Sequence, residues 1–137
     1  MLTWAAGYLG AFVTFLGIDM LWLGMMAPRF YRPTLGDIAI SGVNLPPALL
    51  FYAIYPIGLL IFAINPALKS GSLAAALISG ALFGLFTYAT YDLTNHATLR
   101  NWTLALTTVD VAWGTLLAAL ASAAGFLVVS KFAATGL

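Results

Sequence analysis

The sequence contains no cysteine and no glutamate, and only 7% of its residues are charged. Without cysteine the chain has no disulfide, no thiol chemistry and no thiolate metal site, and its redox compartment stays open. Soluble globular domains carry about 25% charged residues, so the low charge content argues against that class. The net charge of +1 also offers no electrostatic basis for binding nucleic acid.

Apolar residues make up 63% of the 137 positions, more than a small soluble domain can bury. They form four segments, at about 3–26, 46–64, 72–93 and 103–130. Each is close to the roughly 20 residues that a helix needs to cross a bilayer. We therefore predict an all-α membrane protein in which residues 1–137 form a single domain. Its four transmembrane helices should form a compact antiparallel bundle.

Proline and glycine mark the connections between these segments. The first connection, "APRFYRPTLGDIAISGVNLPP", holds four prolines and predicts a structured loop. "NPALKSGS" predicts a short turn, and the third connection lies around "NHATLRNW". Pro56 should kink the second helix. We expect the first segment to be a retained helix rather than a signal peptide, because no basic residue precedes it and Asp19 interrupts it.

Four spans predict a topology in which both termini lie on one side of the membrane with the second connection. The first and third connections then share the other side. Basic residues are balanced, with Arg29, Arg32 and Arg100 on one side and Lys69, Lys131 and the terminal amine on the other. The positive-inside rule therefore does not settle the orientation.

Small residues recur at helical spacing in the third and fourth segments, for example Gly80 and Gly84, and Gly114, Ala118 and Gly125. In lipid such stripes let two helix backbones approach closely, because burying apolar surface away from apolar tails yields little. We expect these stripes to pack the bundle internally. A dimer interface is the alternative.

Three of the four aspartates are predicted to converge. Asp19 lies about seven residues before the end of the first helix, and Asp110 about seven residues after the start of the fourth, roughly 10 Å deep in each case. Asp92 lies in the last predicted turn of the third helix. All three fall in the half of the membrane next to the first and third connections. On the first helix Tyr8, Phe12, Phe15, Asp19 and Trp22 form one stripe, and the aspartate favours this stripe as the inward face.

We predict that this polar cluster forms a binding pocket. The candidate pocket residues are Asp19, Trp22, Tyr88, Tyr91, Asp92, Asn95, Asp110 and Trp113, and the candidates for an anionic headgroup are Arg29, Arg32 and Arg100. A structural role is the alternative: the carboxylates can pair with these arginines to hold the bundle. Asp92 can cap loop backbone, and the aromatic residues Tyr88, Tyr91 and Trp102 can form an interfacial belt.

Two smaller features bear on this site. "DMLW" (19–22) and "DVAW" (110–113) share the pattern Asp-x-x-Trp, which places each tryptophan beside its own aspartate, where it can donate an N–H. So short a match is weak evidence for an inverted repeat. His96 lies near the carboxylates, but paired histidine spacing is absent, so we expect no metal site and no cofactor.

The fragments "IDMLWLG", "ATYDLTNHATLRNW" and "TTVDVAWGT" resemble a bacterial family of small four-helix membrane proteins, domain-of-unknown-function family twenty-one seventy-seven. The resemblance covers nearly the whole chain. It implies a multi-pass protein of the bacterial inner membrane. It also implies that ten residues lie on the family's signature positions: Asp19, Trp22, Tyr91, Asp92, Thr94, Asn95, Thr98, Asp110, Trp113 and Gly114. His96 departs from the family pattern, where an apolar residue is usual. The resemblance implies no activity.

Three functional classes follow from these residues. In the first, which we favour, the pocket binds a lipid headgroup or small amphiphile, and the protein modifies it or assists a partner enzyme. In the second, the aspartates titrate in a small carrier or a proton or cation site. In the third, the protein is a structural subunit of a larger membrane complex or a homo-oligomer. The nearby arginines favour an anionic headgroup, and the expected partners are membrane lipids. The sequence leaves open whether the protein is an enzyme.

Overall fold

The computed structural model describes residues 2–134, and within them every regular element is helical. Four stretches are long and apolar enough to cross a membrane: 2–38, 45–70, 73–98 and 104–132. The predicted all-α bundle of four spans is therefore confirmed. The elements are α1 (Leu2–Met26), a π-helical segment (Ala27–Tyr31), α2 (Arg32–Leu35), a 3-10 turn (Gly36–Ile38), α3 (Leu45–Leu59), a second π-helical segment (Leu60–Ile64), α4 (Asn65–Ser70), α5 (Leu73–Thr98) and α6 (Leu104–Ala134).

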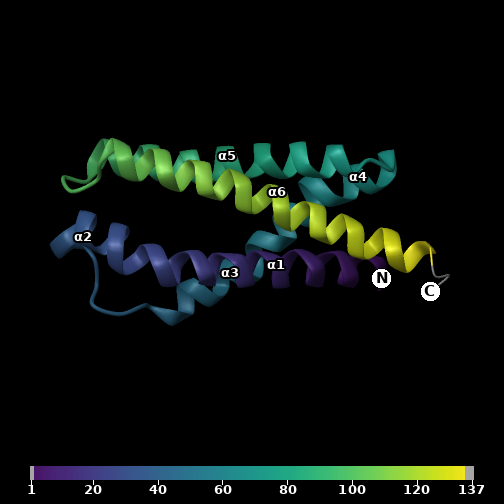
Figure 1. Ribbon diagram of the computed structural model, residues 1–137, viewed down its shortest axis with the longest axis horizontal. Coiled ribbons are helices and arrows are strands. Elements are labelled where there is room, and N and C mark those ends of the chain that lie inside the picture. The colour runs from purple at the N-terminus through teal and green to yellow at the C-terminus, as the bar shows by residue number, and fades with distance from the viewer. Residues whose placement is uncertain (1, 135–137) are drawn as a thin grey trace.

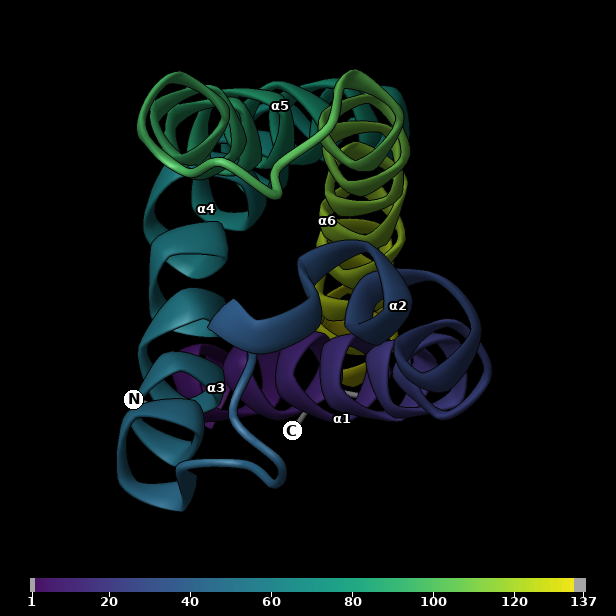
Figure 2. The same cartoon turned by 90° about the vertical axis from the view of Figure 1, so that its left-hand side faces the viewer.

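Figure 1 shows that α1 begins and α6 ends at the same end of the bundle, where α4 also lies. The opposite end carries α2 and the connections 39–44 and 99–103. Viewed from that end, the spans follow one another around the bundle in the order α1, α3–α4, α5, α6 (Figure 2). We call the end of the bundle that carries α2 the α2 end, and the opposite end the α4 end.

Helix α6 packs against both α5 and α1, because it crosses from one to the other along its length (Figure 1). A Cβ on Gly84 would lie 2.4 Å from the Gly114 carbonyl oxygen, and one on Gly80 would lie 2.5 Å from Ser122 Oγ. On the other side of α6, a Cβ on Gly125 would lie 2.9 Å from the carbonyl oxygen of Gly7 in α1. The small-residue stripes therefore pack the chain against itself, as predicted.

The helices extend further than the sequence predicts, so three predicted boundaries were wrong. The first connection is helical up to Ile38, "NPALKS" is helical, and α5 continues through His96 to Thr98. Two of these places contain or adjoin a π-helical segment: Ala27–Tyr31 includes Pro28, and Leu60–Ile64 ends two residues before Pro66. There the N–H of Arg32 bonds to Ala27, and that of Asn65 to Leu60. A widened turn accommodates a proline that lacks an N–H, so the helix bends instead of ending.

The α2 end is held by a side chain of the third connection. Asn101 Nδ2 donates to the Leu35 carbonyl oxygen at 2.7 Å and to Asp37 Oδ1 at 2.9 Å. Leu35 is the last residue of α2, and Gly36 after it has φ +58°, a conformation that favours glycine. These bonds attach the end of the first span to the α5–α6 connection, above the aspartates.

Candidate functional site

The aspartate face of α1 points into the bundle. Its buried residues are Gly7, Ala11, Phe15 and Asp19, and Asp19 is only 5% exposed. The predicted inward stripe is confirmed for Phe15 and Asp19, whereas Tyr8, Phe12 and Trp22 are only half-buried beside it. Phe15 contacts Tyr52 and Tyr55 of α3, and Asp19 lies one turn further along α1, beside Tyr52 in the middle of α3.

Asp19 accepts two hydrogen bonds, each from another helix. Tyr52 Oη donates to Oδ2 at 2.6 Å, and Trp113 Nε1 donates to Oδ1 at 2.9 Å. The three residues come from α1, α3 and α6, so the carboxylate joins three of the four spans. A hydrogen bond within a folded protein contributes about 0.5–1.5 kcal/mol, so these two bonds help to hold the three helices together at the α2 end.

Asp110 on α6 also accepts a hydrogen bond from an aromatic side chain of another segment. Tyr31 Oη donates to Asp110 Oδ1 at 2.5 Å, and Trp22 Nε1 donates to the same Tyr31 oxygen at 3.0 Å. Tyr31 reaches Asp110 because the π-helical segment carries the chain beyond the end of α1. The sequence predicts a structured loop after residue 26, and that prediction gives no reason to place Tyr31 there.

The two Asp-x-x-Trp fragments are paired crosswise. Trp113 donates to Asp19, and Trp22 acts on Asp110 through Tyr31, so neither tryptophan serves the aspartate of its own fragment. The two indole rings stack on each other with centroids 4.1 Å apart and planes 6° apart. The antiparallel course of α1 and α6 produces this arrangement, because each tryptophan lies one turn from its own aspartate and faces the neighbouring helix.

A cavity of about 650 Å³ lies among these residues, with walls from α1, the first π-helical segment, α3, α5 and α6. Of the predicted pocket residues, it brings together Asp19, Trp22, Tyr88, Tyr91, Asp110 and Trp113. The rest of its lining is Leu23, Tyr31, Pro47, Ala48, Phe51, Tyr52, Tyr55 and Thr87.

Asp92 and Asn95 do not line this cavity. Asp92 is fully buried on α5, where the carboxyl group of Asp110 lies beside it. Neither oxygen of Asp92 receives a hydrogen bond from a donor in the described part of the chain. As two carboxylates, Asp92 and Asp110 can share a hydrogen bond only when one of them carries a proton.

The three arginines also lie outside the cavity lining. Arg29, Arg32 and Arg100 are exposed, and Arg32 donates to the Ser41 carbonyl oxygen at 2.8 Å. The hydrogen bonds that Asp19 and Asp110 accept within residues 2–132 come from tyrosine and tryptophan instead. The geometry therefore gives no support to a pairing of these carboxylates with arginine.

His96 belongs to α5 rather than to a loop, contrary to the sequence-based expectation. Its Nδ1 atom lies 3.3 Å from Thr107 Oγ1, which also accepts a hydrogen bond from Trp102 Nε1 at 3.0 Å. These contacts join α5 to the start of α6. Between residues 2 and 134 no three histidine or aspartate side chains are placed to hold a metal ion.

Sequence reasoning missed three tyrosines of the cavity, Tyr31, Tyr52 and Tyr55. Tyr52 and Tyr55 lie three residues apart on the second span, so they share a helix face that contains a polar atom at each turn. In a span of almost wholly apolar residues, that spacing was a usable signal. No such signal marks Tyr31 in the sequence, because its position depends on the helical continuation beyond Met26.

The chain was compared with protein families, curated proteins and solved structures. A family model described as "Predicted membrane protein (DUF2177)" matches residues 4–127, which is most of the chain. No curated protein and no solved structure matches it.

Proposed function

The chain belongs to this family of membrane proteins, and we propose that it binds a membrane amphiphile, with the polar head in the cavity and an acyl tail in an adjoining groove. The head then lies beside Asp19 and Asp110, where the protein can modify it or present it to a partner enzyme. The observation that carries the proposal is a residue shared by the cavity and the groove, Thr87.

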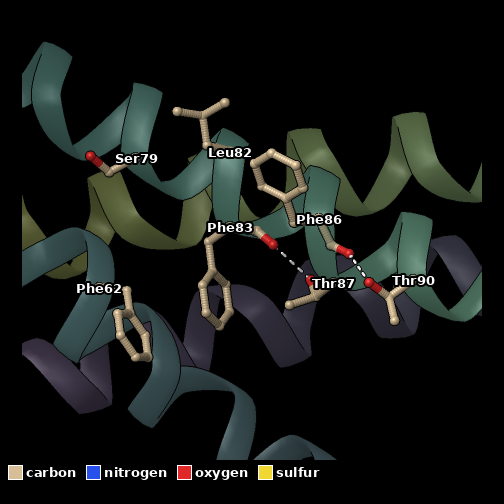
Figure 3. A pocket seen from close by; sticks show the side chains of 7 residues that line it. All are labelled: Phe62, Ser79, Leu82, Phe83, Phe86, Thr87 and Thr90. Carbon is tan, nitrogen blue, oxygen red and sulfur yellow. Dashed lines mark hydrogen bonds between the residues drawn. The ribbon is translucent and has the colours of Figure 1, made fainter.

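The groove lies on the lipid-facing side of α5, beside the second π-helical segment. It has a volume of about 690 Å³ and is lined by Phe62, Ser79, Leu82, Phe83, Phe86, Thr87 and Thr90. Figure 3 shows the rings of Phe62 and Phe83 side by side, with Thr87 and Thr90 further along α5. Both threonine hydroxyls donate to carbonyl oxygens of their own helix, Thr87 to Phe83 and Thr90 to Phe86. Apart from the Ser79 hydroxyl, the surface left for a ligand is therefore apolar.

The boundary between the groove and the cavity is a small set of side chains. Tyr55 of α3 and Thr87 of α5 share a hydrogen bond of 2.9 Å, and the Tyr55 ring contacts Phe83 at 5.4 Å. Tyr55 and Thr87 line the cavity, and Phe83 and Thr87 line the groove. Thr87 is therefore the residue at which the aromatic cavity and the apolar groove adjoin.

The length of the groove fits one acyl chain of one leaflet. On α5 it extends from Ser79 to Thr90, which corresponds to roughly 16 Å at 1.5 Å per residue. The hydrocarbon core of a bilayer is about 30 Å thick, so one leaflet has nearly the same length as the groove. A single-leaflet tail therefore suits the groove, and its head would reach the depth of Thr87 and the cavity beyond.

Retained amphiphile is the direct test. The protein would be purified in a maltoside detergent and its co-purified lipids identified by mass spectrometry. Thr87→Phe should fill the junction and remove the retained molecule. Thr94→Phe is the matched control, because Thr94 lies two turns away on the same helix and lines neither space. Equal retention in both variants, or no retained amphiphile in the wild type, would contradict the proposal.

A second candidate function is a proton or cation site, and one observation favours it. Asp92 is fully buried, no group between residues 2 and 132 donates to it, and it lies beside Asp110. Intramembrane carboxylates of this kind occur in proton relays. Proteoliposomes containing wild type and Asp92→Asn would decide: proton or cation flux that the variant abolishes supports it, and equal flux contradicts it.

A further inference from the structure

The charged side chains of the cavity lining are all acidic. It contains the carboxyl groups of Asp19 and Asp110, and it contains no lysine, arginine or histidine. Most of the other lining residues are aromatic: Trp22, Tyr31, Phe51, Tyr52, Tyr55, Tyr88, Tyr91 and Trp113. Behind Asp110 lies the buried carboxyl group of Asp92, which adds acidic rather than basic character.

The hydrogen-bond donors of this lining are largely engaged within the wall. Tyr52 and Trp113 donate to Asp19. Tyr31 donates to Asp110, and Trp22 donates to Tyr31. An anionic head such as a phosphate needs free N–H or O–H donors or a basic side chain. Three of these four groups already donate hydrogen bonds to the carboxylates, and Trp22 donates to Tyr31.

Besides the Tyr88 hydroxyl, what remains available to a ligand is mainly carboxylate lone pairs and the faces of aromatic rings. Both attract a positive charge, the first by direct attraction and the second through the negative face of the ring. Rings that surround a cation without hydrogen bonds suit an alkylated ammonium group, which has few or no N–H donors of its own. A metal ion is a poorer fit, because no three acidic or histidine side chains of the described residues converge.

We infer that the head bound in the cavity is an organic cation, an alkylated or quaternary ammonium group, held between Asp19, Asp110 and the surrounding aromatic rings. The inference rests on the proposed function, because it assigns the charge of the head that the cavity takes. It differs from the sequence-based preference for an anionic headgroup, which depended on arginines that the fold places elsewhere.

The test uses two probes with the same tail, decyltrimethylammonium and decyl phosphate. Each is titrated by calorimetry into the protein in maltoside micelles, with empty micelles as the blank. The ammonium probe should bind at least about tenfold more tightly than the phosphate probe. Equal affinity, or tighter binding of the phosphate, would overturn the charge assignment but leave amphiphile binding intact. If neither probe binds beyond the blank, the proposed function itself fails.

Variants then locate the charge preference. Asp19→Asn and Asp110→Asn should each weaken ammonium binding about tenfold and leave phosphate binding nearly unchanged or improved. Tyr88→Leu removes a ring face without removing a charge, and should weaken ammonium binding several-fold. It serves as the second line of evidence if an amide variant does not fold. Asp37→Asn is the matched control, because Asp37 is an exposed acid outside the cavity lining. An equal loss in the control would show attraction to the surface instead, and would overturn the inference.

Discussion

At the α4 end of the bundle, α1 and α6 meet through glycine: a Cβ on Gly10 would lie 3.2 Å from the Cα of Gly125. At the α2 end α1 and α6 stand further apart (Figure 1), and stacked indoles and tyrosines that surround two carboxyl groups lie between the helices. The α4 end is held by close contact between backbones. The α2 end is held by side-chain hydrogen bonds that cross between helices.

The difference reflects what lipid can and cannot supply. Lipid tails solvate apolar side chains as well as a protein core does, so an apolar interface is stable only where backbones approach closely. Lipid offers no partner to a carboxylate or an indole N–H, so such groups must find partners within the bundle. The α2 end therefore carries the polar chemistry, and the α4 end supplies a rigid base for it.

The largest expected effect concerns the exposure of the two ends. If they face opposite sides of the membrane, labelling of single cysteines should be all-or-none. Arg100→Cys and Lys69→Cys, both exposed and at opposite ends, are the test positions in this cysteine-free chain. A membrane-impermeant maleimide added to intact cells or oriented vesicles should label only one of them. If both positions are labelled from one side, the two ends do not face opposite sides of the membrane.

At the α4 end, Gly125→Leu should be strongly destabilising. Its Cβ would lie 2.5 Å from Ile64 Cδ1 and 2.9 Å from the Gly7 carbonyl oxygen, and the backbone of α1 cannot move away cheaply. We expect a loss at the upper end of about 1–3 kcal/mol. Gly17→Leu is the matched control, because no atom lies within 4 Å of a Cβ there. Unfolding in mixed dodecyl sulfate micelles measures both, and equal stability would contradict close packing.

At the α2 end, Asp19→Asn should cost about 1–2 kcal/mol. An amide has one acceptor oxygen and one donor nitrogen, so it cannot accept from both Tyr52 and Trp113. The same unfolding assay applies. A variant as stable as the wild type would show that these bonds do not hold the end together.

Tyr31→Phe should cost about 0.5–1.5 kcal/mol, because it removes the hydroxyl that joins Trp22 to Asp110. Tyr8→Phe serves as the control, since the Tyr8 hydroxyl bonds a carbonyl oxygen of α3 away from the cavity. A double-mutant cycle with Trp22→Phe should show coupling for Tyr31 and none for Tyr8. Additive effects at Tyr31 would contradict the chain of bonds.

The smallest effect, and the one of opposite sign, is expected for Asp92→Asn. Its carboxyl group is buried with no donor among the described residues, and the new amide N–H can donate to Asp110. We expect a gain of up to about 1 kcal/mol. A clear loss of stability, in the same unfolding assay, would show that the wild-type carboxyl group has a structural partner.

Local patterns were enough to predict much of this architecture. Runs of about 20 apolar residues predict spans wherever they occur, because the bilayer sets one required length. The inward face of α1 followed from Asp19 alone, since an intramembrane acid that faces lipid is too costly. The internal packing of Gly80, Gly84 and Gly114 followed from their spacing, because helical periodicity depends only on neighbouring residues.

The sequence by itself thus determined the class, the four spans and the half of the bundle that holds the acids. Only the tertiary structure decided which groups meet. The crossed pairing of Asp19 with Trp113, and of Asp110 with Tyr31, depends on how far each helix is rotated and shifted against the others. Tyr31 reaches the cavity and Arg32 does not because a π-helical turn redirects the chain after Met26. Such rotations and bends are set by contacts between distant segments, which periodicity within one segment cannot encode.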